Sequence, residues 1–328
     1  MTDEPIPHWP GGLVTLGGDH RVYVRSAPDR DGEPALCVHG LAGSSRNWTD
    51  LIDLLRPRLA CDAVDLPGFG DSPPRPDRRY SLAALAQTVA ALIESRGSRQ
   101  KPVHLIANSL GGAVAVKLAA ARPDLVKTLT LISPALPDSR PHLDQVQFAV
   151  MSLPRIGAPL LAKYDTLSPE TRVADVIANC FSDPARFPPE RFAAEVAELA
   201  RRDTLDHATA ALIGTIRALT AEFFRKGRHA TWRDAARVTA PTLVIYGGDD
   251  RVVDPRLAGR AAHAFASPRI VVLPRTGHLA HMEHPGQVAA EIAIMLDATA
   301  QPAQPAQPAQ PAQPASRPAR EFPLLPAG

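Results

Sequence analysis

The chain has 328 residues, which is enough for one large α/β domain or for two domains of ordinary size. Its 45% hydrophobic and 21% charged residues give the balance of a soluble globular protein. The formal net charge is only +2, from 36 basic and 34 acidic side chains, which argues against nucleic acid as a partner. Short basic clusters such as residues 225–228 are therefore interpreted as solvated surface.

The three cysteines, Cys37, Cys61 and Cys180, are widely separated and form no C-x-x-C pair, which argues against a disulfide framework and against a zinc site. The N-terminus is acidic and interrupted by proline, whereas a secretory signal is basic and then apolar. No apolar run approaches the length of a membrane span. These features favour a cytoplasmic protein without a metal or cofactor, and they leave its oligomeric state open.

Short apolar runs alternate along the chain with stretches of helical periodicity. The expected strands are residues 35–38, 60–64, 103–107, 129–132, 242–246 and 270–273. One expected helix begins after Ser81, a good N-cap, and has apolar residues on one face from residue 82 to residue 93. The other expected helices of this alternation span residues 110–121, 256–265 and 287–296. Such alternation predicts parallel strands with crossover helices, and thus an α/β fold whose mostly parallel sheet is flanked by helices.

A long helical segment interrupts the alternation at residues 134–234 and includes amphipathic stretches at 189–200 and 205–223. Ligands of open α/β sheets bind beyond the carboxyl ends of the strands, so helices inserted between two strands are expected to cap the site. The predicted organisation is a core of residues 1–133 and 235–299 with a cap of residues 134–234.

The surplus of proline is partly a property of the C-terminal segment. Eight of the 34 prolines follow Thr299, where five Ala-Gln-Pro units run from residue 300 to residue 314. Proline at every third position matches the period of polyproline II, so residues 300–328 are expected to form an extended, disordered tail. A docking element for a partner's aromatic groove is the alternative function of such a tail.

One serine occupies a position that suits a nucleophile. The segment Ala107-Asn108-Ser109-Leu110-Gly111-Gly112 joins an expected strand to an expected helix. A serine at such a sharp turn lifts its hydroxyl above the sheet, and its neighbours are small because the strand and helix backbones approach closely. The usual motif is G-x-S-x-G, and Ala107 stands at its first position. The helix also directs its N-terminal amides toward any negative charge formed near Ser109.

A serine hydroxyl needs a base, and the base needs a carboxylate to orient it. Asp249 and Asp250 follow the expected strand 242–246, and His278 follows the next expected strand. The order Ser, Asp, His along the chain is the one expected for a nucleophile on this kind of turn. The sequence therefore predicts a triad of Ser109, His278 and one of the two aspartates.

Three further motifs accompany the triad, namely His39-Gly40-Leu41, the turn at residues 65–72 and Glu283-His284-Pro285. Together these motifs resemble the α/β-hydrolase superfamily over residues 11–298, and their order and context make the resemblance specific. The resemblance implies a capped enzyme similar to serine esterases and lipases. It also favours Asp250 over Asp249, because Asp250 is third after Gly247.

The same resemblance implies an oxyanion hole made by the backbone N–H groups of Leu41 and Leu110, and the loss of such a donor lowers turnover by about 10²- to 10³-fold. The expected partner is a small-molecule substrate with an apolar acyl group of modest size. The residues proposed to line its pocket are Trp48, Asn108, Phe148, Met151 and Leu279. Apolar cap residues that motivate this expectation also include Leu153, Leu160, Leu161 and Phe181.

Several alternatives accompany this interpretation. The segment from Asn108 to Gly112 also resembles carbon–carbon bond hydrolases of ring-cleavage pathways, although these commonly place Trp where Leu279 follows His278. Acyltransferases and perhydrolases share the fold. A non-catalytic scaffold that binds ligands is the alternative from another class. His278, His281 and His284 recur every third residue, but the turn after His278 argues against a shared metal, and His39 is expected to bond within its own loop.

Overall fold

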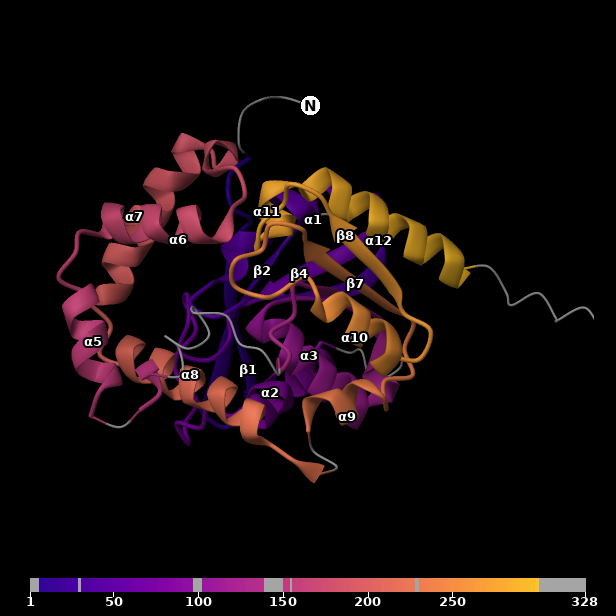
Figure 1. The fold of residues 1–328 in the computed structure, drawn as a ribbon, viewed down its shortest axis with the longest axis horizontal. Helices are drawn as coiled ribbons and strands as arrows, with labels where there is room; N and C mark the ends of the chain where they lie inside the picture. Colours follow the sequence, from indigo (N-terminus) through magenta and orange to yellow (C-terminus); the bar gives the residue numbers. More distant parts are fainter. Residues whose placement is uncertain are drawn as a thin grey trace, which may run out of the picture.

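The computed structural model describes residues 6–28, 31–96, 102–138, 150–153, 155–227 and 230–300. Within these residues an eight-stranded sheet has the order β1-β2-β4-β3-β5-β6-β7-β8 (Figure 1). The strands are β1 (Gly11–Gly17), β2 (His20–Ser26), β3 (Glu33–Val38), β4 (Leu59–Val64), β5 (Val103–Asn108), β6 (Val126–Ile132), β7 (Thr242–Gly247) and β8 (Arg269–Leu273). The β1–β2 and β2–β4 pairs are antiparallel and the other pairs are parallel. The α/β fold with a mostly parallel sheet is therefore confirmed.

Every strand expected from the sequence is present, and the antiparallel pair of β1 and β2 is an addition. Burial explains the difference. Strands β4, β5 and β7 are buried along their whole length and read as continuous apolar runs. Strand β1 lies at the edge of the sheet and exposes most of its residues, including Leu13, which is 50% exposed. Such a strand carries no apolar run to identify it.

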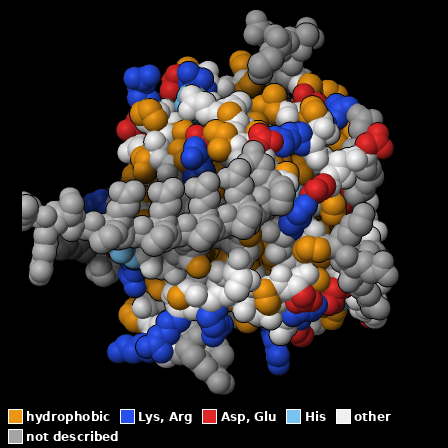
Figure 2. All heavy atoms as spheres, turned by 90° about the vertical axis from the view of Figure 1, so that its right-hand side faces the viewer, with side chains coloured by type: hydrophobic (Ala, Val, Ile, Leu, Met, Phe, Trp, Pro, Cys, Tyr) orange, Lys and Arg blue, Asp and Glu red, His pale blue; other side chains and the backbone are white. Residues whose placement is uncertain are grey.

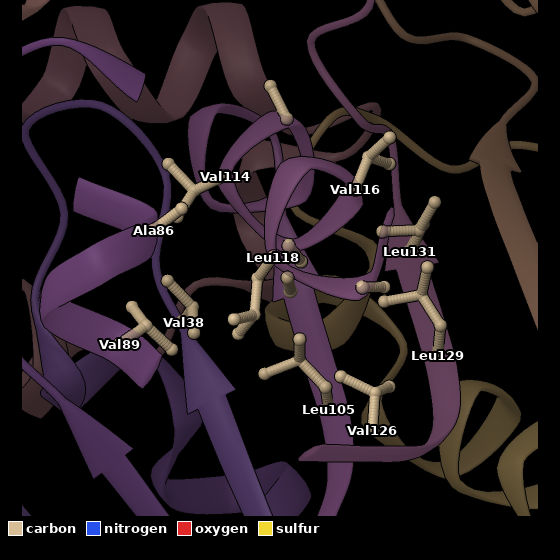
Figure 3. Packing of buried hydrophobic residues seen from close by; sticks show 14 of the residues in the cluster. Val38, Ala86, Val89, Leu105, Val114, Val116, Leu118, Val126, Leu129 and Leu131 are labelled. Atoms are coloured by element: carbon tan, nitrogen blue, oxygen red, sulfur yellow. The ribbon is translucent and has the colours of Figure 1, made fainter. Parts of the chain in front are cut away.

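Helices cover both faces of the sheet. Helices α2 (Leu82–Ser95), α3 (Leu110–Ala121), α9 (Thr231–Ala235) and α10 (Leu257–Ala264) contribute to one apolar cluster, and α1 (Thr49–Leu55) and α12 (Pro285–Ala300) contribute to the other. Figure 3 shows the first cluster, in which side chains of β3, β5 and β6 pack against α2 and α3. The residues labelled there are Val38, Ala86, Val89, Leu105, Val114, Val116, Leu118, Val126, Leu129 and Leu131. This packing fixes α3 on the sheet.

Between β6 and β7 the described chain forms α5 (Gly157–Tyr164), α6 (Pro169–Cys180), α7 (Pro189–Asp203) and α8 (Ala208–Phe224), and it contains no strand there. These helices lie together along one side of the sheet (Figure 1). Helix α9 also falls within the predicted cap, but it contacts α3, and its Trp232 packs against the core cluster. The division at residue 234 stays a prediction, as does the tail at 300–328, which lies outside the described residues except for Ala300.

Charged and polar contacts fasten α7 to the core. The Arg191 guanidinium lies 2.7 Å from the Asp50 carboxylate, and that of Arg201 lies 3.0 Å from Asp71. Arg202 Nη1 donates to the Ala42 carbonyl at 2.7 Å. Because the Asp50 side chain is 40% exposed, such pairs add little to stability, and they mainly set the orientation of the helix.

The charges on the surface and the length of the helices relate to two partners considered from the sequence, nucleic acid and a membrane. On the face shown in Figure 2, Lys and Arg side chains are interspersed with Asp and Glu side chains among apolar ones. This mixture agrees with the small net charge. None of the helices in the described part of the chain is long and apolar enough to cross a membrane.

The contact between α3 and β3 depends on Gly111. A Cβ atom at this position would lie 2.4 Å from the Val38 carbonyl oxygen and 2.5 Å from that of His39. Both obstacles are backbone atoms, so neither can rotate away. In contrast, a Cβ at Gly259, inside α10, would meet nothing within 4 Å.

We predict opposite effects for alanine at these two glycines. Gly111→Ala forces the backbones apart and lowers the free energy of unfolding by about 1–3 kcal/mol. Gly259→Ala adds a methyl group in open space within a helix and raises that free energy by about 0.5–1 kcal/mol. Urea denaturation followed by circular dichroism measures both. Equal stability of the two variants would contradict the close approach at Gly111.

Candidate active site

Ser109 occupies a strained turn between β5 and α3. Its backbone angles are φ 52° and ψ −118°, in a region that costs a residue with a side chain of order 1–3 kcal/mol. The Ser109 N–H donates to the Ile132 carbonyl at 3.1 Å, and the Ala135 N–H donates to the Ser109 carbonyl at 2.9 Å. These bonds to the end of β6 and the chain after it hold the turn against its strain.

Asp250 and His278 meet beyond the ends of β7 and β8. His278 Nδ1 lies 2.9 Å from Asp250 Oδ2, and both residues are buried. The second carboxylate oxygen, Oδ1, accepts the N–H groups of Val252 and Val253 at 2.8 and 2.9 Å. Burial acts to raise the pKa of Asp250, but the charge and hydrogen bond of His278 and the Val253 N–H outweigh it and hold the pKa below its usual value.

The neighbouring aspartate has a different partner. Asp249 Oδ2 accepts a hydrogen bond from Ser182 Oγ at 2.6 Å. The geometry thus brings Asp250, and not Asp249, to the imidazole of His278. An N–H on Nδ1 directed at Asp250 leaves Nε2 as the ring atom able to accept a proton.

Asn108 connects the serine turn to His278. Its Nδ2 donates to the Ile132 carbonyl at 3.0 Å and to the His278 carbonyl at 3.2 Å. The side chain is 1% exposed, so both bonds are shielded from water. Asn108 was expected to line the pocket; both of its amide hydrogens bond to backbone carbonyls, and its place in the pocket stays a prediction.

The loop after β3 faces Ser109. A Cβ at Gly40 would lie 3.1 Å from Ser109 Cβ. The Gly40 carbonyl accepts hydrogen bonds from His39 Nδ1 at 2.7 Å and from the Gly43 N–H at 3.2 Å. Because C=O and N–H point in opposite directions across one peptide plane, these bonds also fix the direction of the Leu41 N–H. His39 therefore bonds within its own loop through Nδ1, as expected, and its Nε2 also accepts the Leu66 N–H at 2.9 Å.

The N–H groups of Leu41 and Leu110 are available as donors. No described residue accepts a hydrogen bond from either of them. Leu110 is the first residue of α3, where a backbone N–H has no acceptor inside the helix. The loop next to Ser109 and the first residue of α3 thus each carry an N–H group with no acceptor among the described residues, and the helix adds its positive end.

The other proposed pocket residues are distributed differently. Trp48 is fully buried and stacks on His281, with ring centroids 4.3 Å apart, so it packs the core and does not line a pocket. Met151 is half-buried, and its carbonyl packs against Gly157. Phe148 lies outside the described residues. Leu279 packs against an apolar cluster of the inserted helices.

That cluster joins α6 and α7 to the loop of His278. Its buried members are Val173, Ile177 and Phe181, and its half-buried members are Cys180, Phe187, Phe192, Val196, Leu199, Leu279 and Met282. Phe181 and Leu279 were expected near the substrate from the sequence and the other members were not, although Phe192, Val196 and Leu199 have the spacing of one helical face. Leu153 and Leu160 were expected near the substrate, yet they are 44% and 43% exposed.

The histidines that follow His278 have separate environments. His281 is buried against Trp48, and burial lowers its pKa to about 3, helped by the nearby His278. His284 Nε2 lies 3.2 Å from the Arg275 carbonyl. In the ranges that the structure covers, no group of three or more His, Cys, Asp or Glu side chains has the arrangement of a metal site.

Similarity to known proteins covers most of the chain. Monoacylglycerol lipase abhd6-B of Xenopus laevis is 26% identical over 77% of this chain and 72% of its own length. The acetyltransferase component of the acetoin cleaving system of Pseudomonas putida is 28% identical over 81% of this chain, which spans only 64% of that relative. The 2-hydroxy-6-oxo-6-(2'-aminophenyl)hexa-2,4-dienoic acid hydrolase of Metapseudomonas resinovorans is 26% identical over 84% of this chain and 87% of its own length.

A solved structure and a family model extend this similarity to the fold. A thermophilic esterase from Thermogutta terrifontis superposes with a TM-score of 0.68 at 22% identity, covering 88% of this chain and 99% of the esterase, which shows a shared fold. The model of the alpha/beta hydrolase family matches residues 35–291. The chain is therefore an enzyme that belongs to the alpha/beta hydrolase family.

Proposed function

We propose that the protein is a serine hydrolase that cleaves carboxylic esters of small to medium apolar substrates through an acyl-enzyme. The contact of 2.9 Å between His278 Nδ1 and Asp250 Oδ2, beside the strained turn of Ser109, carries this proposal. It supplies an oriented base where the turn presents a hydroxyl. The similarity to a monoacylglycerol lipase supports an ester as the substrate.

In the proposed reaction the triad and the two backbone N–H groups act in both steps, the formation of the acyl-enzyme and its hydrolysis. His278 Nε2 takes the proton of Ser109 Oγ, which attacks the ester carbonyl, and the N–H groups of Leu41 and Leu110 bind the resulting oxyanion. The alcohol leaves with the proton from His278. A water molecule then gives one proton to His278 and attacks the acyl-enzyme; as the acid leaves, His278 returns that proton to Ser109 Oγ, which restores both groups. Asp250 holds the imidazole and stabilises its charged form.

The helices between β6 and β7 are proposed to act as the cap at residues 134–234. Support comes from the apolar cluster of α6 and α7, which packs against Leu279 immediately after His278. An apolar wall at this point favours an acyl or alkyl group over a charged one. A cytoplasmic location remains the prediction from the sequence.

A carbon–carbon bond hydrolase is the second candidate. The segment from Asn108 to Gly112 favours it, as does the similarity to the dienoic acid hydrolase of Metapseudomonas resinovorans. Leu279 argues against it, because these enzymes commonly carry Trp at that position. Acyl transfer, as the relative from Pseudomonas putida suggests, differs from hydrolysis only in the acceptor of the acyl group.

Covalent labelling of Ser109 separates an enzyme from a ligand-binding scaffold. We predict that a fluorophosphonate labels the wild-type protein at Ser109 and does not label Ser109→Ala, which also loses at least about 10³-fold in kcat on p-nitrophenyl esters. Mass spectrometry of the labelled peptide identifies the site. A folded wild-type protein that takes up no label would exclude the serine mechanism.

The two adjacent aspartates provide a matched pair of variants. We predict that Asp250→Asn lowers kcat by about 10⁴-fold, because the imidazole loses the partner that fixes its tautomer. Asp249→Asn removes only the charge of the acceptor of Ser182 Oγ and is expected to change kcat by less than about threefold. Steady-state kinetics with one p-nitrophenyl ester measures both. Full activity of Asp250→Asn would refute the proposed triad.

A panel of substrates tests the proposed bond and acyl group. We predict that kcat/KM is highest for p-nitrophenyl esters of modest apolar acids and at least about tenfold lower for charged acyl groups, which the apolar wall does not solvate. A ring-cleavage dienoate is included as the comparison. A higher kcat/KM for the dienoate than for every ester would establish the second candidate.

A further inference from the structure

Glu283, in the short helix α11 (Ala280–Glu283), is a buried carboxylate that the proposed reaction does not use. Its Oε2 accepts the Gly277 N–H at 2.7 Å and the Ser182 N–H at 3.2 Å, and its Oε1 accepts the Asp183 N–H at 2.9 Å. Gly277 precedes His278, whereas Ser182 and Asp183 follow α6. One carboxylate therefore joins the loop of His278 to a segment about 100 positions earlier in the chain.

The same two segments touch through their backbones. The Cys180 carbonyl accepts the N–H groups of His278 at 2.7 Å and of Leu279 at 3.3 Å. A Cβ at Gly277 would lie 2.3 Å from the Cys180 carbonyl oxygen, so the backbones are already at their closest approach. The His278 N–H is thus paired with a residue of the inserted helices, and its own loop does not supply that acceptor.

The structure assigns Glu283 as a positioning residue that clamps the segment Cys180–Asp183 to the loop of His278 and so holds the imidazole in place for proton transfer. This inference rests on the proposed function, in which His278 is the base. It makes the last turn of α6 a part of the apparatus that positions the base. Removal of the carboxylate acceptor leaves three backbone N–H groups short of a partner in a buried place.

The charge of Glu283 is the reason why the clamp is specific. None of the ion pairs among the described residues involves Glu283, so the three N–H groups are the partners that stabilise its carboxylate. Glutamine offers one acceptor oxygen and turns an NH₂ group toward N–H donors. The resulting repulsion moves the two segments apart, and His278 moves with its loop.

A comparison of leaving groups tests this role. A p-nitrophenolate departs without a proton, whereas an alkoxide must be protonated by His278, so a misplaced imidazole harms alkyl esters more. We expect Glu283→Gln to lower kcat/KM for a methyl ester at least about tenfold more than for the p-nitrophenyl ester of the same acid. That effect is a fraction of the about 10²- to 10⁴-fold that general acid–base catalysis contributes. The ratio of the two values is independent of how much of the variant is folded.

Glu222→Gln is the matched control. Glu222, in α8, is also 3% exposed, and it binds Lys117 and Thr231 at 3.0 and 2.8 Å, far along the chain from the loop of His278. We expect this variant to lower both kcat/KM values by the same factor. If Glu283→Gln does not fold, Glu283→Asp keeps the charge and retracts the oxygens, and the same change in ratio is expected from it.

The outcomes separate the two proposals. If the wild-type protein hydrolyses neither ester and takes up no fluorophosphonate, the proposed function and this inference both fail. If the wild type hydrolyses both esters, and the Glu283 variants reduce the two kcat/KM values in parallel as Glu222→Gln does, only the positioning role of Glu283 is overturned.

Discussion

The backbone turn at Ser109 is the constraint on which the rest of the site depends. Its positive φ is unfavourable for serine, and the turn persists because bonds to Ile132, at the end of β6, and to Ala135, in the chain after it, hold it in place. Gly111 lets α3 begin immediately against β3, so the first N–H groups of the helix open toward the serine. A hydroxyl, a helix terminus and the loop after β3 are thereby placed around one point.

Parallel strand order then brings the remaining groups to that point. β3, β5, β6, β7 and β8 are consecutive in the sheet, and the segments after β3, β5, β7 and β8 carry the Gly40 loop, Ser109, Asp250 and His278, respectively. Residues far apart in the sequence become neighbours because each follows a strand of the same sheet. Asn108 then holds the backbone of His278, and the N–H groups of Val252 and Val253 fix the orientation of the Asp250 carboxylate, which the strands only bring near.

The sequence predicted the central strands and the triad because both leave local patterns. A strand buried on both faces is a run of apolar residues, and a strained turn between strand and helix requires small neighbours around Ser109. The half-exposed edge strand β1 has no such run. Trp48 also shows a limit of prediction from sequence, because a large aromatic residue suits a pocket wall and a core equally well. Only its burial against His281 in the structure decides between them.

The bonds of Glu283 could not be predicted for a related reason. Its position five residues after His278 was visible as part of a motif, but its partners are backbone N–H groups, which every residue except proline possesses. No side-chain type marks Ser182 and Asp183 as the segment that it contacts. Pairing of this kind is set by the path of the chain after α6, which periodicity alone does not determine.

The bond from the His278 N–H to the Cys180 carbonyl has a consequence for how such proteins diversify. Inserted helices are often treated as an exchangeable module that changes substrate preference while the chemistry stays with the sheet. Here the backbone carbonyl of Cys180, at the end of α6, binds the backbone of the residue that carries the imidazole. Replacement of these helices by foreign ones would therefore change both the pocket and the position of His278, unless the backbone path of residues 180–183 were kept.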